Sequence, residues 1–238
     1  MFNRIVAEYS NAIVPTGALC MVNCQSLTGY VTSGQLGTGK KNDQNTPDFD
    51  TWLINLDALV AACKQCHIPA PLCIQIFQAL VHNLCSQSLN IMLAGRDYCN
   101  WRRGMQIQYN ISRLLEWTRD SLILDLYPCQ SPRVHKKTSD VCAFEKLLEP
   151  LLQAAKLVQL SGELFADFEA VVGNVATQLN AAQIVRIMSQ VEHVDQQVVA
   201  AFARGNAGAA GGEIYRAWER VEWKCEIGEI GEMIGDEK

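Results

Sequence analysis

The chain has 238 residues, of which 49% are hydrophobic and 19% are charged, and its formal net charge is −5. This length suits one large domain or two small ones, and the apolar share is ample for a buried core. The negative net charge argues against binding to nucleic acid, because a duplex-binding surface normally needs a concentrated basic patch. The basic clusters are short, namely Arg102-Arg103 and Arg133 with Lys136-Lys137.

No segment of the sequence indicates export or membrane insertion. The N-terminal stretch MFNRIVAEYSNAIV carries Arg4 and Glu8 and lacks the continuous apolar core of a signal peptide. The most apolar long stretch, residues 68–95, is interrupted by polar side chains, which is atypical of a membrane span. We therefore expect a cytoplasmic protein whose ten cysteines are free thiols.

The apolar residues recur with a helical period, whereas strict alternation over more than a few residues is missing. The predicted fold class is therefore all-α. Residues 1–17 are interpreted as the end of an N-terminal helix that Pro15 and Gly17 terminate. Residues 18–47 are rich in glycine and polar residues and are predicted to form a flexible loop.

Three helices are predicted in the middle of the chain. The first starts near Asp50, a natural N-cap residue, and ends near His67. The second, residues 71–94, is apolar almost all round and should be central, with neighbours on most sides. The third spans about 104–119 and carries one apolar stripe.

The C-terminal half alternates polar stretches with shorter helical patterns. Residues 126–140 are predicted to form a loop, and Pro150 should be the first residue of the next helix. Asn180 and Gln183 have the spacing of a capping box at the start of another helix. The remaining predictions are a weak helix at 163–172, a helix at 195–204, and a Gly-rich linker followed by an acidic, poorly packed tail at 205–238.

The motif Cys63-Lys64-Gln65-Cys66-His67 has the CxxCH spacing of a haem attachment site or part of a zinc site. A zinc site needs four ligands, and the chain has no second CxxC or HxxxH to complete one. Covalent haem would require export. We interpret these residues as core cysteines at a helix end, where the helix dipole favours a histidine cation.

The stretch from Gly34 to Lys41, GQLGTGKK, fits the GxxxxGK part of a phosphate-binding loop. Lys41 occupies the position that should offer a hydroxyl group to magnesium, and KNDQNTPDFD cannot continue as a helix. Nucleotide binding is therefore not predicted. The four scattered histidines (His67, His82, His135 and His193) also suggest no catalytic pairing. The sequence predicts a binding module without catalytic residues, cofactor or metal.

The segment from Tyr98 to Asp120, YCNWRRGMQIQYNISRLLEWTRD, closely resembles the dilute domain in the globular, cargo-binding tail of class V myosins. The stretches LEPLLQAA from Leu148 and LNAAQIV from Leu179 resemble the next helix starts of that family, and VDQQVVAAFAR from Val194 is a weaker match. The resemblance covers about residues 48–204, which we take as a dilute-type helical domain, and more weakly 1–17.

The resemblance implies an elongated bundle of long helices, formed in full-length tails by two packed subdomains, of which this chain holds the second only in truncated form. We expect the motif residues to support the fold. Trp101 and Tyr109 should anchor the turn between helices, and Trp117 should flank the core. Gln106 and Asn110 should share a face and bond to a neighbouring backbone. The motif also includes Gly104 and Met105.

The resemblance further implies a cargo-binding tail module of a class V myosin-like protein, which binds protein adaptors and Rab-type GTPases during actin-based transport of vesicles or organelles. Such tails can also bind their own motor head. An alternative is a dilute-type domain in a non-motor junctional or cytoskeletal scaffold. Either reading places the protein in the cytoplasm with the actin cytoskeleton or vesicles, without membrane insertion. The partner-binding residues are unknown at this stage, and only Arg102 and Arg103 are exposed candidates.

Overall fold

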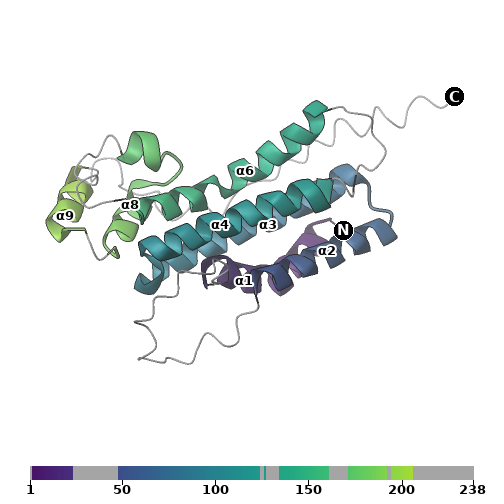
Figure 1. The fold of residues 1–238 in the computed structure, drawn as a ribbon, viewed down its shortest axis with the longest axis horizontal. Coiled ribbons are helices and arrows are strands. Elements are labelled where there is room, and N and C mark those ends of the chain that lie inside the picture. The colour runs from purple at the N-terminus through teal and green to yellow at the C-terminus, as the bar shows by residue number, and fades with distance from the viewer. Residues whose placement is uncertain are drawn as a thin grey trace.

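The computed structural model describes residues 2–23, 48–123, 126, 134–160, 171–191 and 194–205, and all regular structure in these ranges is helical. The predicted all-α class is thus confirmed, and the long helices run along the long axis of an elongated molecule (Figure 1). The elements in chain order are α1 (Phe2–Asn23), α2 (Phe49–Gln65), α3 (Ala70–Ala94), the 3-10 helix η2 (Arg96–Tyr98), α4 (Trp101–Trp117), the π-helix η3 (Thr118–Ile123), α6 (Val134–Leu157), the π-helix η5 (Val171–Val175), α8 (Ala181–Met188) and α9 (Gln196–Gly205).

Helix α3 lies at the centre of the bundle, as predicted. It packs against α1 on one side and α6 on another, and α4 packs in turn on α6. Its buried residues include consecutive pairs, such as Ile76-Phe77 and Leu80-Val81, so neighbours cover most of its circumference. Helices α8 and α9 lie together at one end of the molecule (Figure 1).

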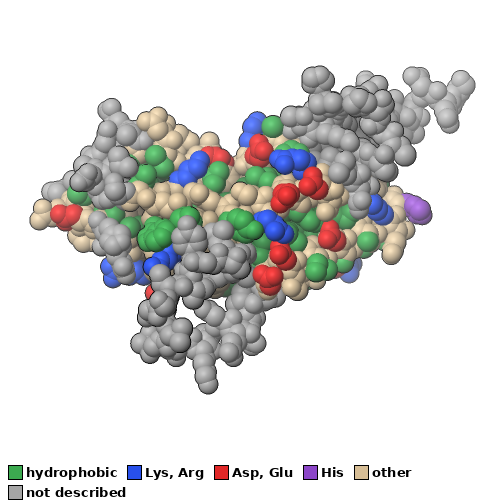
Figure 2. Space-filling model, in the orientation of Figure 1, with side chains coloured by type: hydrophobic (Ala, Val, Ile, Leu, Met, Phe, Trp, Pro, Cys, Tyr) green, Lys and Arg blue, Asp and Glu red, His purple; other side chains and the backbone are tan. Residues whose placement is uncertain are grey.

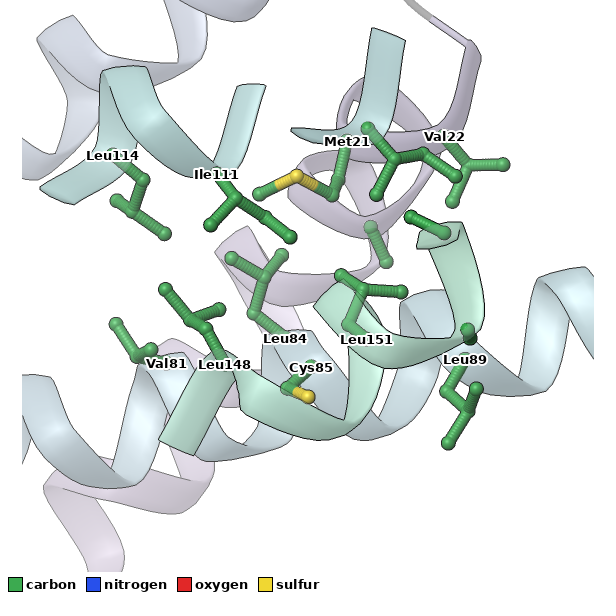
Figure 3. Packing of buried hydrophobic residues seen from close by; sticks show 14 of the residues in the cluster. Met21, Val22, Val81, Leu84, Cys85, Leu89, Ile111, Leu114, Leu148 and Leu151 are labelled. Atoms are coloured by element: carbon green, nitrogen blue, oxygen red, sulfur yellow. The ribbon is translucent and has the colours of Figure 1, made fainter. Parts of the chain in front are cut away.

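The core forms where four helices meet (Figure 3). Met21 and Val22 from α1, Ile111 and Leu114 from α4, and Leu148 and Leu151 from α6 surround α3 residues such as Leu84. Each of these side chains is at most 2% exposed. Fully burying one such aliphatic side chain stabilises the fold by about 1.5–3 kcal/mol. The large number of these residues therefore explains how helices from distant parts of the sequence stay together.

Helix α1 continues through Pro15 and Gly17 to Asn23, so the predicted termination at these residues is wrong. Proline removes one backbone hydrogen bond and disfavours a helix interior. Here the residues that follow it are deeply buried: Ala18 and Met21 are both 0% exposed. Packing against α3 outweighs the local preference, and the first part of the predicted loop 18–47 is helical.

Helix α6 likewise begins at Val134 and contains Pro150 in its interior, so Pro150 is not the first residue of a helix. The predicted loop 126–140 is wrong for residues 134–140, which are helical. Leu148 and Leu151, on either side of the proline, are at most 1% exposed. Burial of the residues around Pro150 again stabilises a helix that the sequence alone does not predict.

The helix starts differ from the predictions by a few residues. The N-cap residue of α2 is Asp48 rather than Asp50, although its side chain makes no capping hydrogen bond, and Asp50 lies in the first turn. The capping box at α8 is confirmed, because the Asn180 side chain accepts from the Gln183 backbone and the Gln183 side chain accepts from the Asn180 backbone. Most of the predicted helix 163–172 and residues 206–238 of the predicted tail lie outside the described residues.

Candidate functional site

The turn that leads into α4 is fixed by Asn100. Its Oδ1 accepts from the Arg103 backbone N–H at 3.0 Å, and its Nδ2 donates to the Asp97 carbonyl at 3.0 Å. Such an N-cap satisfies donors that the first helical turn leaves without intrahelical partners. Trp101 is 42% exposed, with the Arg102 guanidinium 5.5 Å from its ring centroid. That Trp101 anchors this turn stays a prediction.

Gly104 marks the closest approach between α4 and α6. A Cβ at this position would lie 2.6 Å from the Ala155 carbonyl oxygen and 2.7 Å from Val158 Cγ2. Only a residue without a side chain leaves space for that contact. Met105, the motif residue that follows Gly104 in the sequence, is half-buried.

Gln106 and Asn110 lie on one buried face of α4 and are hydrogen-bonded to each other, with Gln106 Nε2 donating to Asn110 Oδ1 at 3.1 Å. Asn110 Nδ2 in turn donates to the Met21 carbonyl at 2.9 Å and approaches the Cys20 carbonyl at 3.4 Å. The last four carbonyl groups of a helix have no partners within it. Asn110, which accepts from Gln106, therefore caps the C-terminal end of α1.

Arg103 contributes to the same cap, because its Nη1 donates to the Asn23 carbonyl at 2.7 Å. The sequence prediction placed the end of the first helix six residues earlier and so could not identify what Gln106, Asn110 and Arg103 contact. The i, i+4 spacing of the two amides was the available signal, and it indicated their shared face but not their partner.

Trp117 and Tyr109 connect α4 to other parts of the bundle. Trp117 is 6% exposed, and its Nε1 donates to Asp57 Oδ1 on α2 at 2.6 Å. Its ring packs on Phe77 of α3, with centroids 5.7 Å apart. Tyr109 is half-buried about two turns into α4, away from the turn it was predicted to anchor, and helps to raise the pKa of the Arg113 guanidinium. Arg113 in turn pairs with Asp50 at 2.7 Å.

A groove of about 360 Å³ lies between α1 and α2. Its lining residues are Tyr9, Ala12, Ile13 and Thr16 from α1, and Trp52, Asn55, Ala58 and Leu59 from α2. Trp52 forms one wall, and its Nε1 donates to the Ile13 carbonyl at 3.1 Å. A Cβ at Gly17 would overlap the Trp52 ring, so this glycine permits the two helices to meet there.

The apolar surface extends beyond the groove along α2. Ile54 is 63% exposed and lies four residues before Ala58, hence on the same side of the helix. Ile54 therefore gives a partner in the groove one large exposed aliphatic side chain to contact. Sequence reasoning did not find this groove, because four of its lining residues belong to a helix that was predicted to end at Pro15 and Gly17.

The CxxCH residues do not converge on a shared point. Cys63 is buried and hydrogen-bonds to Cys73, and burial raises the pKa of the Cys63 thiol to about 12. Cys66 and His67 are exposed. Within the described ranges, no group of three or more His, Cys, Asp or Glu residues could hold a metal ion. The stretch from Gly34 to Lys41 lies outside the described residues.

The end of α2 instead has the hydrogen bonds of a Schellman motif. The Ile68 N–H donates to the Cys63 carbonyl and the His67 N–H to the Lys64 carbonyl, both at 3.0 Å. His67 has a φ of 53°, in the left-handed region. This position is usually occupied by glycine, so the histidine of CKQCH occupies a strained helix end.

The fold and the groove together define an elongated all-helical bundle with an open surface between two helices. The DIL domain profile matches residues 75–195, and the chain belongs to the DIL domain family. The resemblance to the dilute domain is thereby confirmed. None of the helices in the described ranges is long and apolar enough to cross a membrane.

The curated relatives are class V myosins. The chain is 26% identical to unconventional myosin-Va of Gallus gallus over 205 residues, which cover 84% of this chain and 10% of the relative. It is 31% identical to unconventional myosin-Vb of Rattus norvegicus over 134 residues, or 55% of this chain and 6% of the relative. The chain thus spans about a tenth or less of these relatives' lengths.

Two solved structures share the fold. One is described as Myo2-GTD in complex with Mmr1, with a TM-score of 0.66 and 19% identity over 90% of this chain and 47% of that chain. The other, a myosin V cargo binding domain, has a TM-score of 0.62 and 19% identity over 87% of this chain and 47% of that chain. The likeness is to the cargo-binding tail rather than to the motor head, and this chain spans about half of that tail domain.

Proposed function

We propose that this chain is a cargo-binding module that docks short segments of adaptor proteins in the groove between α1 and α2. The groove is the observation that carries the proposal, because it combines a recess between two helices with the exposed Ile54 beside it in a chain of the DIL family. Related tail domains were solved in complex with Smy1, Mmr1 and Inp2. Their shared fold supports the same role here.

The chemistry of the groove suits an amphipathic segment. Ile13 in the groove and the exposed Ile54 beside it offer apolar contacts, and Thr16 and Asn55 can hydrogen-bond to a backbone or a polar side chain. A partner that inserts one or two large apolar side chains would bury them at about 25 cal/mol per Å².

The wider functional proposal follows from the class V myosin relatives. The module would also bind Rab-type GTPases and, within a longer protein, a myosin motor head, and it would act in the cytoplasm on vesicles or organelles that move along actin. It would carry no catalytic activity of its own. The relatives named above are all myosins, which supports a motor tail over a scaffold domain.

The test fills the groove without touching the core. Ala58 is exposed and lines the groove, whereas Ala61 is exposed on the same helix and does not line it. Ala58→Arg should weaken binding of an adaptor segment, measured by fluorescence anisotropy with labelled fragments of Mmr1, Smy1 and Inp2, by at least about tenfold. Ala61→Arg should leave the dissociation constant within about twofold of the unmodified chain.

Equal losses in the two arginine variants would contradict a role for the groove. Absence of binding by the unmodified chain to all three fragments and to a panel of GTP-loaded Rab proteins would contradict the cargo-binding proposal itself. Circular dichroism melting curves of both variants establish that each is folded.

A further inference from the structure

Three cysteines lie at the turn between α2 and α3, at one end of the molecule (Figure 1). Cys63 is in the last turn of α2, Cys66 is the C-cap residue of that helix, and Cys73 is in the first turn of α3. A histidine side chain, drawn in purple, stands on the surface at this end in Figure 2, and His67 of the turn is exposed. The turn is therefore open to small molecules from solvent.

Cys63 and Cys73 form a buried pair across the turn. Cys63 is 3% exposed and Cys73 is 0% exposed, and their side chains are hydrogen-bonded to each other. The Cys73 thiol also donates to the Ile68 carbonyl at 3.5 Å. Two sulfur atoms within hydrogen-bond reach need only a small movement to form a disulfide bond of about 2.05 Å. The pair is thus placed for a bond that links the end of α2 to the start of α3.

Cys66 differs from this pair because its side chain is exposed. Burial, together with the neighbouring Cys73 and Cys66, raises the pKa of the Cys63 thiol to about 12. Burial also raises the pKa of the Cys73 thiol. Because the thiolate is the form of cysteine that attacks an oxidant, the buried pair reacts slowly by itself. Cys66 is the accessible thiol of the three.

We propose that Cys66 is an oxidation site for a small peroxide, and that its reaction leads to a disulfide between Cys63 and Cys73. In the first step, hydrogen peroxide transfers one oxygen to the Cys66 sulfur, which gives a sulfenic acid and one water. The Cys63 thiol then attacks that sulfur and forms a Cys63–Cys66 disulfide. The hydroxyl group of the sulfenic acid leaves with the thiol proton as a second water.

The Cys63–Cys66 disulfide is strained and passes its bond on to Cys73. Residues three apart on a helix have Cβ atoms about 5–6 Å apart, whereas a disulfide needs about 3.5–4.5 Å. The Cys73 sulfur attacks the Cys63 sulfur, the bond to Cys66 breaks, and the Cys73 proton passes to Cys66, which becomes a thiol again. Over the whole sequence two thiols lose two electrons and two protons, and one peroxide becomes two waters.

The disulfide closes the turn covalently between the two helices. Disulfides in a reducing compartment are typically transient and redox-sensing, and a thiol reductant reverses this one by exchange. Helix α2 forms one wall of the groove, so oxidation fixes the end of that wall. This last consequence rests on the proposed function, whereas the thiol chemistry does not.

The test treats the reduced full chain with hydrogen peroxide, blocks the remaining thiols with iodoacetamide and maps the peptides by mass spectrometry. Trypsin cleaves after Lys64, which places Cys63 in one peptide and Cys66 with Cys73 in the next, and fragmentation of the linked peptides identifies the bonded cysteine. The Cys63–Cys73 disulfide should be the main product within one chain. The melting temperature should rise by about 4–10 °C on oxidation, and dithiothreitol should reverse the rise.

Cys66→Ser removes the accessible thiol and keeps the buried pair, so the disulfide should form at least about tenfold more slowly. Cys142→Ser is the matched control, because Cys142 is exposed on α6, outside the turn. Its rate of disulfide formation should stay within about twofold of the unmodified chain. Cys73→Ala should stop at the Cys66 sulfenic acid, which dimedone traps, and at the Cys63–Cys66 disulfide.

The proposal is overturned if no Cys63–Cys73 disulfide forms, or if Cys66→Ser and Cys142→Ser form it at the same rate. It is also overturned if the main product is a disulfide between two chains through Cys66. Equally fast formation of the same pair in concentrated urea would contradict it as well, since the folded turn would then play no part. No adaptor is present in any of these measurements, so their failure is distinct from a failure of the groove.

Discussion

At the scale of single residues, Asn110 of GMQIQYN and the nearby Arg103 act as a cap for another helix. Asn110 and Arg103 bond to the carbonyl groups of Met21 and Asn23, at the end of α1. Both carbonyls lack a partner within α1. From the sequence alone, these motif residues would be taken for exposed polar side chains of a helix. They instead join the N-terminal helix to the centre of the bundle.

His67 provides a prediction at this scale. Its φ of 53° costs a residue with a Cβ about 1–2 kcal/mol relative to glycine. Glycine also loses more backbone entropy on folding, about 0.4–1 kcal/mol. His67→Gly should therefore raise the free energy of unfolding by about 0.5–1 kcal/mol, measured by urea denaturation.

His67→Ala is the control, because alanine keeps the Cβ and hence the strain. Its free energy of unfolding should stay within about 0.5 kcal/mol of the unmodified protein. A gain in His67→Ala equal to that in His67→Gly would show that the imidazole, rather than the left-handed backbone, destabilises this helix end.

At the scale of elements, Gly104 determines how closely α4 can approach α6. Gly104→Ala would place a Cβ 2.6 Å from the Ala155 carbonyl oxygen, which belongs to the backbone and cannot rotate away. We expect a loss of about 1–3 kcal/mol in the free energy of unfolding, measured by urea denaturation.

The matched control is Gly173→Ala, where an added Cβ meets nothing within 4 Å. This variant should be neutral or more stable by up to about 1 kcal/mol, because alanine restricts the unfolded chain. Equal destabilisation of the two variants would indicate that the loss comes from glycine replacement in general and not from the contact between α4 and α6.

The sequence was sufficient to predict the elements that have a clear helical period or a clear capping motif. The all-α class, the central position of α3 and the buried stripe of α4 at Ile107, Ile111 and Leu114 follow from a helical period that the structure preserves. The capping box at Asn180 follows from local hydrogen bonding. In these cases local preference and tertiary packing agree.

The sequence failed where packing opposes local preference. Pro15 and Pro150 both lie inside helices that burial on α3 and α4 maintains. Because α1 was predicted to end early, neither the groove nor the partner of Asn110 could be deduced.

At the scale of the whole molecule, buried thiols make stability depend on alkaline pH. Burial raises the pKa of Cys85 to about 12 and that of Cys99 to about 11, from an ordinary value near 9.0. The unfolded chain releases these protons first as pH rises. The stabilising contribution is therefore fully present below pH 9 and is lost progressively as pH rises toward the folded values.

Urea denaturation under reducing conditions at several pH values from 7 to 10.5 should show this loss. The free energy of unfolding should fall above pH 9, with each buried thiol adding up to about 1 kcal/mol per pH unit. Cys85→Ala, which lowers stability at every pH, should show a shallower fall above pH 9. An unchanged slope in this variant would mean that other groups, such as tyrosines and lysines, cause the alkaline loss.

The hydrogen bonds from α4 to the end of α1 also affect which insertions and deletions the chain can tolerate. The Met21 and Asn23 carbonyl groups in the last turn of α1 accept hydrogen bonds from side chains of residues 103–110. These two bonds set no requirement on the length or composition of 24–47. Insertions and deletions between the first two helices can accumulate over evolution without detaching the N-terminal helix from the bundle.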